Sequence, residues 1–508
     1  MSQTFFFYDL ETSGLDPRAD RIMQFAGQRT DLDLNPIGDP INLLVKLNDD
    51  TLPSPQAIFV TKITPQKTQQ DGLTEHEFAK FLVTEIFTPG TIATGYNSIR
   101  FDDEFIRHLL WRNFHDPYEW QWKDNRSRWD LLDVARLTRA LRPEGINWPF
   151  DQEGKATNRL ELITKLNKIN HQSAHDALSD VTALIAVTKL IKTKQPKLYN
   201  YLFKLRDKKE IQKLVNLVNP QPFVYSSGRL ASEFNKTSVF HPLAPTPNGN
   251  ILVYDLRYNL DNLLAGKGNE LEDEGENVEF GERSFSPVKK SDYPNSENLS
   301  EPRRGESFSE LDDKKTFLHS RVKDGSQNST FSPIVKELKY NRCPAVAPLS
   351  VLDQQDGWKK LQLTKETVMK NLQTLTKNPT FAEQSRTAHE ERPDFPPAPD
   401  PESALYDGFL NNADRVRCDK ITNTKPDQLA DFHPEFADPR LPELLTHYKA
   451  RNFPNTLSAT EQDQWEQYRA KRLSQQAPTF LAELETFTAT KQDPFLAEEL
   501  YLWYQSLL

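Results

Sequence analysis

Cysteine is almost absent from this chain, whose 508 residues contain only Cys343 and Cys418. Neither belongs to a Cys-x-x-Cys pattern, so a zinc site or a disulfide scaffold is disfavoured and a reducing cytoplasm is expected. Long apolar runs are missing as well. No stretch approaches 18 apolar residues, and the N-terminus has neither the basic region nor the cleavage site of a secretory signal. Membrane insertion and secretion are therefore both disfavoured.

An excess of positive charge is also lacking. The formal net charge is −10 at pH 7, which argues against a protein that coats nucleic acid without specificity. It leaves room for a basic channel on an acidic body. No fixed-period repeat is evident. What the chain does have is length and hydrophobic content, 37% of 508 residues, enough for about three domains with real cores.

The first domain is predicted to span residues 1–200, where strand and helix patterns alternate. Strands come first and helices follow, which is typical of a mixed sheet flanked by helices. We expect a strand that begins at residue 5 and is closed by the turn signal at Gly14, further strands at 21–30, 41–47 and 91–96, and helices at 74–87, 102–114, 129–141, 158–169 and 174–192.

The remaining sequence changes character twice. Short β-rich pieces at 221–227, 237–241 and 250–256, separated by Pro, Gly and Asn, predict a small barrel in a domain at 201–355. The polar, acidic stretch at about 267–333 is predicted to be a disordered insertion in it. From 356 to 508 helical periodicity dominates, and it predicts an all-α domain with helices at 364–376, 459–473, 478–489 and 494–507.

The most informative segment is Phe-Phe-Phe-Tyr-Asp-Leu-Glu-Thr-Ser-Gly at 5–14. Side chains alternate along a strand, so Asp9 and Glu11 share one face while Leu10 points away. Two carboxylates at the end of a core strand repel each other and lose hydration unless a cation lies between them. Hard ions such as Mg²⁺ prefer such oxygen ligands. The alternative is a strand end with two solvated acids.

Two later motifs add to this pair. The first is Gly-Tyr-Asn-Ser-Ile-Arg-Phe-Asp at 95–102, a strand end, a turn and a helix start that carries Asp102. The second is His-Asp-Ala-Leu-Ser-Asp at 175–180. Ser173 and Asp176 have the spacing of a capping box, which puts His175 in the first turn of a helix. His175 and Asp180 do not share a helical face, but they can converge on a site beside the N-terminus of the helix.

These motifs, in this order, resemble the DEDDh branch of the DnaQ-like 3′→5′ exonucleases. Within that superfamily the chain is most similar to the bacterial exonuclease I family, which is specific for single-stranded DNA. The longer strings that carry this likeness are Arg-Trp-Asp-Leu-Leu-Asp-Val at 128–134, Leu-Arg-Pro-Glu-Gly-Ile-Asn-Trp-Pro at 141–149, Leu-Tyr-Asp-Gly-Phe at 405–409 and Ala-Arg-Asn-Phe-Pro at 450–454. The resemblance implies an α/β ribonuclease-H-like exonuclease domain, an SH3-like β-barrel domain and an all-α domain that closes a C-shaped channel.

The resemblance also implies a site. Two Mg²⁺ ions, with Mn²⁺ as a substitute, would be held by Asp9, Glu11, Asp102 and Asp180. His175 would be the general base and Glu11 a second catalytic residue, and the products would be 5′-mononucleotides and a shortened 3′ end, in DNA repair or recombination. Histidine suits this role because its pKa of about 6.5 lets it take a proton near neutrality. The implied substrate contacts are Glu11, Thr12, Arg107, Tyr118, Trp122, Arg142 and Arg159.

Residues 100–128 interleave basic and aromatic side chains, the mixture that single-strand channels use to track phosphates and stack bases. The resemblance further implies that the acidic C-terminal tail of single-stranded DNA-binding protein is a partner. A basic pocket would suit that tail, although lysines stand where arginines are expected. A closed channel formed by one chain favours a monomer. The candidate tail-binding residues are Lys359, Lys360, Lys365, Lys370 and Lys377.

Two alternatives stay open. An exoribonuclease of the same superfamily has the same acidic set, but such enzymes are short single-domain chains, whereas some 300 residues follow the catalytic domain here. A polymerase proofreading subunit is disfavoured for the same reason. A catalytically dead clamp on single strands would need a broken acidic set, and every expected position is filled.

Overall fold

The computed structural model describes residues 3–171, 176–264, 334–392, 396–489 and 493–508. The chain forms two compact units. The first comprises residues 1–132, 167–193 and 393–508, and the second comprises 133–166 and 194–392. The first unit therefore combines the N-terminal α/β segment with the C-terminal helices, although these lie at opposite ends of the sequence.

The first unit is built on a five-stranded mixed sheet in the order β3-β2-β1-β4-β5. β1 pairs antiparallel with β2 and parallel with β4, and β4 pairs parallel with β5. The opening strand of the chain is thus the central strand of the sheet. The strands are β1 (Thr4–Thr12), β2 (Ile22–Thr30), β3 (Ile41–Leu44), β4 (Thr91–Gly95) and β5 (Ser127–Asp130).

Alternation along β1 divides its side chains between two faces. Phe6, Tyr8 and Leu10 belong to one buried cluster that also contains Phe25 and Phe78. On the other face Phe5 stacks on Trp129 of β5, with ring centroids 5.9 Å apart. Both faces are apolar over the first half of the strand, which is why the sequence there is a continuous hydrophobic run. Polar residues on one face begin at residue 9.

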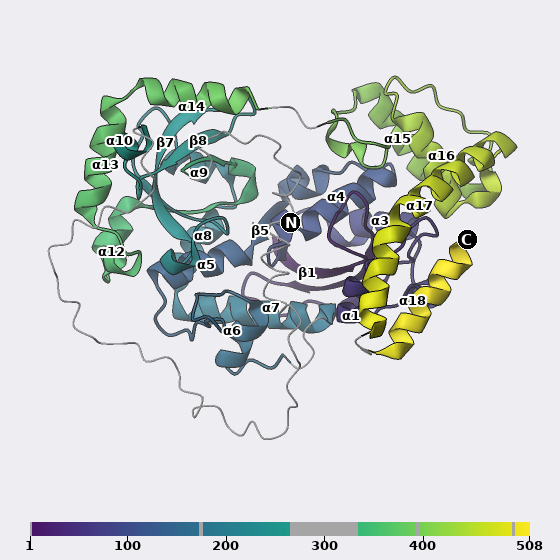
Figure 1. Cartoon of the computed structure of the whole chain (residues 1–508), viewed down its shortest axis with the longest axis horizontal. Coiled ribbons are helices and arrows are strands. Elements are labelled where there is room, and N and C mark those ends of the chain that lie inside the picture. Colours follow the sequence, from purple (N-terminus) through teal and green to yellow (C-terminus); the bar gives the residue numbers. More distant parts are fainter. Residues whose placement is uncertain (1–2, 172–175, 265–333, 393–395, 490–492) are drawn as a thin grey trace. The chain divides into compact units, whose positions relative to one another are not determined.

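The helices of the first unit come from the N-terminal α/β segment and from the C-terminal segment. Thr74 starts α3 with a capping box, because its hydroxyl accepts from the Glu77 N–H while the Glu77 carboxylate accepts from the Thr74 N–H. Figure 1 shows α17 and α18 beside α1, and these helices are in contact. The helices are α1 (Pro55–Thr61), α2 (Pro65–Asp71), α3 (Glu75–Phe81), α4 (Asp102–Arg112), α7 (Ala177–Lys194), α15 (Asn412–Asn423), α16 (Leu441–Asn452), α17 (Ala459–Ala489) and α18 (Pro494–Leu507).

The second unit contains a five-stranded antiparallel sheet in the order β10-β6-β7-β8-β9. Its strands are β6 (Phe223–Ser226), β7 (Thr237–Pro245), β8 (Ile251–Asp255), β9 (Val335–Leu338) and β10 (Ala345–Pro348). The helices of this unit are α6 (Leu160–Leu166), α8 (Pro196–Lys204), α9 (Lys208–Leu214), α10 (Leu260–Leu264), α12 (Gly357–Lys360), α13 (Lys365–Lys377) and α14 (Thr380–Glu390), and α5 (Leu131–Leu141) leads into it from β5. A mixed α/β segment, a small antiparallel sheet and a helical C-terminus confirm the predicted fold class.

Several predicted elements differ in detail. The helix expected from Trp129 begins at Leu131, because Ser127–Asp130 form the edge strand β5. The two helices expected on either side of Pro478 are the single helix α17. The helices at 196–204 and 208–214 were not predicted. The predicted insertion at 267–333 lies outside the described residues, and the predicted domain boundaries at 200 and 355 stay predictions. In the part of the chain that is described, no helix has both the length and the apolar character needed to traverse a bilayer.

Candidate active site

Three carboxylates converge at the end of β1. Asp9, Glu11 and Asp180 each offer an oxygen, and these oxygens lie within 4.8 Å of one another. Asp9 and Glu11 share the face of β1 opposite the buried Leu10, and Asp180 comes from the first turn of α7. All three are partly exposed. The structure thus brings together two predicted ligands that are two positions apart in sequence and a third that lies about 170 residues away.

A β-bulge follows the acid pair. Glu11 pairs with Gln24, but Thr12 pairs with Ile22, so one residue of β2 is skipped. Bulges of this kind end regular pairing and redirect side chains, and they are frequent beside active sites. Thr12 is buried, and its hydroxyl donates to the Gly14 carbonyl at 2.7 Å. Its observed contact is therefore that of a turn residue, and its predicted contact with substrate stays a prediction.

Asp102 is the first residue of α4 and is buried, but it is not a member of the group of three. The two acids that follow it anchor this turn of the helix. Asp103 accepts from the Tyr8 hydroxyl and pairs with Arg128, and Glu104 pairs with Arg107. Burial, then the charges of Asp103 and Asp102, raise the pKa of Tyr8 above its usual value. Asp102 therefore lies close enough for its charge to raise the pKa of Tyr8, the residue before Asp9.

The turn before α4 is held by an acid that we did not single out. Asn97 has the left-handed φ of 67°, which asparagine tolerates better than most residues. The Asp130 carboxylate accepts from the Asn97 N–H at 2.9 Å and from the Ile99 N–H at 3.3 Å. The string Arg-Trp-Asp contains this residue, but only the structure shows that it fixes the motif Asn-x-x-x-Phe-Asp from the neighbouring strand.

The predicted general base, His175, lies outside the described residues. A different histidine contacts the acidic group: the Nε2 atom of His171 is 2.6 Å from Oδ1 of Asp180. The His171 side chain is 3% exposed. Sequence analysis missed this residue because it lies before the motif and a lone histidine in a polar loop carries no signal of its own.

The donor set of the group is chemically uniform, since all three side chains supply carboxylate oxygens. Such a set fits a hard divalent cation and is poorly suited to soft metals. The same three charges repel one another in the absence of a cation. The residues therefore fit the predicted metal site, with Asp102 as a nearby fourth acid.

Besides Glu11 and Thr12, three of the predicted DNA contacts lie in the first unit. Arg107 is buried, pairs with Glu104 at 2.7 Å and donates to Gln121 at 2.8 Å. Tyr118 packs against the Arg107 guanidinium at 5.8 Å and against the Phe409 ring at 5.9 Å. Trp122 is 65% exposed. Trp122 is thus presented to solvent, whereas Arg107 is engaged within the protein.

The other two predicted contacts belong to the second unit. Arg142 donates to the Leu141 carbonyl at 2.7 Å and to the Gln354 amide oxygen at 3.3 Å. Arg159 pairs with Glu161, two residues further along the chain. Their contacts with substrate stay predictions.

Three family models define the class of protein: a domain described as "Exonuclease" matches residues 6–188, an "Exonuclease I SH3-like domain" matches 206–275 and 310–391, and an "Exonuclease I C-terminal domain" matches 399–507. The exodeoxyribonuclease I of Haemophilus influenzae is 38% identical over 492 residues, which cover 96% of this chain and 95% of the relative. The exodeoxyribonuclease I of Escherichia coli is 37% identical, and the match covers 92% of this chain and 89% of that relative. The chain belongs to the exonuclease I family.

A solved structure agrees with this assignment. The crystal structure of E. coli exonuclease I in complex with a dA16 oligonucleotide matches with a TM-score of 0.83 and 34% identity, and the match covers all of both chains. The likeness therefore includes the central sheet, the second unit and the C-terminal helices.

Proposed function

We propose that this protein is an exodeoxyribonuclease that degrades single-stranded DNA from its 3′ end by metal-dependent hydrolysis and releases 5′-mononucleotides. The observation that carries the proposal is the convergence of the Asp9, Glu11 and Asp180 carboxylates within 4.8 Å. Membership of the exonuclease I family supports the same activity, and the relatives named above are exodeoxyribonucleases. Repair or recombination of DNA is the cellular role that we propose for it.

Each residue has a part in this reaction. Asp9, Glu11 and Asp180, with Asp102, would hold two divalent ions, Mg²⁺ by preference. When bound, such a pair stabilises the attacking and leaving oxygens of an in-line displacement at phosphorus. His175 takes the proton from the attacking water, a step worth about 10²- to 10⁴-fold in rate. The bulge after Glu11 fixes the orientation of the acid pair toward the substrate.

A single strand needs cations for its phosphates and aromatic faces for its bases. Trp122 and Tyr118 would supply stacking surfaces, and Arg142 and Arg159 would contact phosphates. Arg107, because it is paired with Glu104, would act by orienting Tyr118 as well as by its charge. This division assigns direct binding to Trp122, which is exposed, and to three partly buried residues, and it assigns positioning to the buried Arg107.

The test uses purified full-length protein with a single-stranded DNA labelled at its 5′ end. A ladder of ever shorter labelled products in Mg²⁺, absent in EDTA, is the expected result. Early release of a labelled mononucleotide would mean 5′→3′ cleavage. Faster loss of a matched RNA would favour the exoribonuclease, and binding without loss in Mg²⁺ would favour the clamp.

Asp180→Asn tests the site itself. It should retain DNA binding and lose several orders of magnitude in turnover, because alignment and activation of the nucleophile depend on the metal ligands. Asp176→Asn is the matched control. Asp176 caps the same helix through the Ser179 N–H, and asparagine caps equally well, so this variant should remain active. Equal activity of both variants would contradict the assignment.

The proposed function also includes a protein partner, an oligomeric state and a cellular location. The acidic tail of single-stranded DNA-binding protein would bind the lysine-rich segment at 359–377, and the enzyme would act as a cytoplasmic monomer. Lys360 pairs with Glu144 at 2.6 Å and Lys365 with Asp353 at 3.2 Å, so an acidic peptide would replace these acids. The Lys360→Glu variant should bind a tail peptide more weakly than the wild type does. Equal binding of the peptide by both proteins would contradict this site.

A further inference from the structure

The turn between β1 and β2 follows directly after the acid pair. Its two ends are joined by reciprocal hydrogen bonds: the Ser13 N–H donates to the Arg21 carbonyl at 2.8 Å, and the Arg21 N–H donates to the Ser13 hydroxyl at 2.9 Å. Ser13 is two residues from Glu11. Any displacement of Arg21 is therefore transmitted to the end of β1 that carries the acid pair.

The turn is also tightly packed. A Cβ atom at Gly14 would lie 2.4 Å from the Asp20 carboxylate, so any side chain there would displace that carboxylate. The Asp20 carboxylate accepts from the Asp16 N–H at 2.8 Å and from the Ser13 hydroxyl at 3.3 Å. The turn thus has one well-defined arrangement.

Residues of the C-terminal segment hold this turn from outside. Arg472 of α17 donates to the Ala19 carbonyl, and its Nε donates to the Asp50 carbonyl at 3.0 Å. The Arg21 guanidinium donates to the Ala19 carbonyl at 2.9 Å and pairs with Glu402 at 2.9 Å. Ala19 therefore receives one guanidinium from each end of the sequence.

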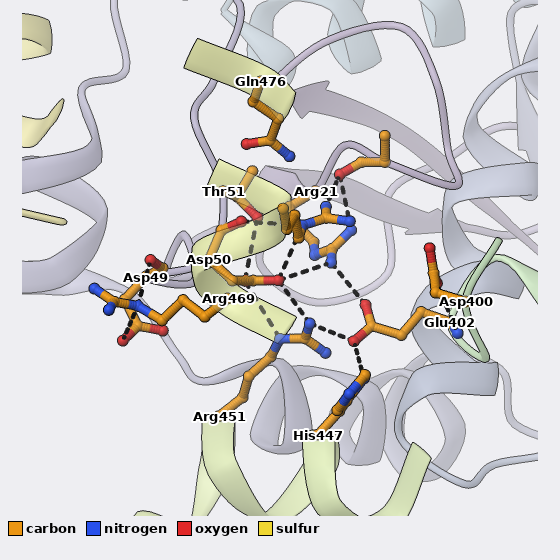
Figure 2. Close-up of polar contacts among 12 residues, drawn as sticks. Arg21, Asp49, Asp50, Thr51, Asp400, Glu402, His447, Arg451, Arg469 and Gln476 are labelled. Atoms are coloured by element: carbon orange, nitrogen blue, oxygen red, sulfur yellow. Dashed lines mark hydrogen bonds and ion pairs between the residues drawn. The ribbon is translucent and has the colours of Figure 1, made fainter. Parts of the chain in front are cut away.

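Arg21 and Arg472 belong to a larger buried ion cluster, which Figure 2 shows around the Arg21 guanidinium. Glu402 accepts from His447 at 2.8 Å and pairs with Arg451, and Asp50 pairs with Arg451 at 2.7 Å and with Arg472 at 3.1 Å. The side chains of Arg21, Asp50 and Glu402 are 0% exposed. In Figure 2, Arg451 and His447 approach from one helix, α16, and point at the two acids.

Charges this deeply buried need an explanation. A buried ion cluster costs so much desolvation that apolar residues of equal volume would stabilise the fold as well or better. Guanidinium groups do what apolar groups cannot, because their fixed N–H fork can bind a carboxylate and a backbone carbonyl together. Arg21 and Arg472 both make this double contact at the turn. We therefore interpret the cluster as a device that fixes the conformation of the turn at residues 13–21.

We propose that Arg472 and Glu402 are positioning residues for the metal site: they fix the turn 13–21, and through Arg21 and Ser13 they fix the acid pair Asp9 and Glu11. This inference rests on the proposed function. The C-terminal segment then contributes to catalysis through the geometry of the metal ligands as well as through any contact with DNA. Without it, Asp9 and Glu11 would bind metal more weakly.

The test measures Mn²⁺ binding to the full-length protein without DNA, by electron paramagnetic resonance of the free ion. Arg472→Met should weaken binding about tenfold, the lower end of the effect of groups that orient metal ligands. The Mg²⁺ concentration for half-maximal nuclease activity should rise to match, with kcat restored at saturating Mg²⁺. Arg472→Lys keeps the charge but not the fork, so it should show a smaller weakening in the same direction.

Lys449→Met is the matched control. Lys449 is 1% exposed and pairs with Glu461 at 2.7 Å, so its loss breaks a buried ion pair between α16 and α17 without touching the turn. It should lower the melting temperature and leave Mn²⁺ binding unchanged. Equal weakening in Lys449→Met, or unchanged binding in both Arg472 variants, would overturn the positioning role.

The wild-type protein separates this proposal from the one it rests on. If the wild type binds no Mn²⁺, or if Asp9→Asn binds as well as the wild type, the proposed metal site is wrong. If the wild type binds and Asp9→Asn does not, but both Arg472 variants bind normally, only the positioning role fails. Should Arg472→Met not fold, Arg472→Lys and Glu402→Gln carry the same comparison.

Discussion

The Nε2 atom of His171 lies 2.6 Å from Oδ1 of Asp180, the carboxylate that α7 contributes to the acidic group. One oxygen of Asp180 is thereby held by a side chain that is itself 3% exposed. Partners of this kind orient a metal-binding carboxylate, and their loss costs about 10- to 100-fold in metal affinity or activity. His171 is therefore expected to orient Asp180, and His175 to act on the nucleophile.

Variants of the two histidines distinguish these roles. His171→Ala should raise the Mg²⁺ concentration needed for half-maximal activity. His171→Gln can still donate a hydrogen bond to Asp180, so its Mg²⁺ requirement should be close to that of the wild type. His175→Ala should instead lower kcat by about 10²- to 10⁴-fold at saturating Mg²⁺ and remove the rise in rate around pH 6.5 that a histidine base produces. The measurement is kcat against pH and Mg²⁺ for each variant. A normal pH profile in His175→Ala would contradict its role as the base.

Stacking of bases on Trp122 can be tested without loss of stability, because the side chain is 65% exposed. Trp122→Ala should weaken single-strand binding by about 1–3 kcal/mol, the usual value of one stacked base, with an unchanged melting temperature. Fluorescence anisotropy of a labelled oligonucleotide in EDTA measures the dissociation constant. Phe495→Ala is the matched control, since Phe495 of α18 is also 65% exposed. Equal affinity of the two variants would remove Trp122 from the binding surface.

Local pattern was enough to single out the three acids that the structure brings together. The alternation at residues 5–11 placed Asp9 and Glu11 on one face of a strand, and the motif at 175–180 placed Asp180 near a helix start. These predictions depend on a few consecutive residues and on strand or helix geometry, which sequence encodes directly. The resemblance to a family added Asp102 and the order of the domains. The structure then placed Asp9, Glu11 and Asp180 together.

Long-range polar contacts could not be predicted in the same way. Arg21 and Glu402 are 381 positions apart, and each, taken alone in the sequence, is interpreted as a solvated charge. In the fold both side chains are 0% exposed, and the C-terminal helices pack on residues 47–63. Pro478 was misleading for a related reason. A proline removes one hydrogen bond of a helix, but Leu473 and Phe480 on either side pack into the same core cluster, and α17 continues through it.

Asp20 should give the fold an unusual dependence on pH. Burial raises its pKa from 3.8 to about 6, partly offset by the Asp16 N–H. Between these values the folded state binds the proton more tightly, so the contribution of Asp20 to the free energy of unfolding falls as pH rises from about 4 to 6. Because Asp20 is partly exposed, we expect about 1–2 kcal/mol of this change, less than the full value of such a pKa difference. Urea unfolding at several pH values measures it.

The dependence should disappear in Asp20→Asn, which carries no charge at either pH. Asp33→Asn provides the comparison, since the Asp33 side chain is 83% exposed and lies outside the turn. Its unfolding should follow the wild-type curve from pH 4 to 6. A wild-type slope in Asp20→Asn would assign the effect to another group.

The acidic group should make the stability of the protein depend on divalent ions. Asp9, Glu11 and Asp180 repel one another, and a bound cation converts this repulsion into attraction. At a Mg²⁺ concentration 100 times its dissociation constant, binding adds about 2.7 kcal/mol to the free energy of unfolding. Glu11→Gln removes one of the repelling charges, so its metal-free form should be more stable than the wild type, while its gain from Mg²⁺ should shrink. Thermal unfolding in EDTA and in Mg²⁺ measures both. Glu498→Gln, which changes an exposed acid of α18, should keep the wild-type gain. An undiminished Mg²⁺ gain in Glu11→Gln would show that the ion binds elsewhere.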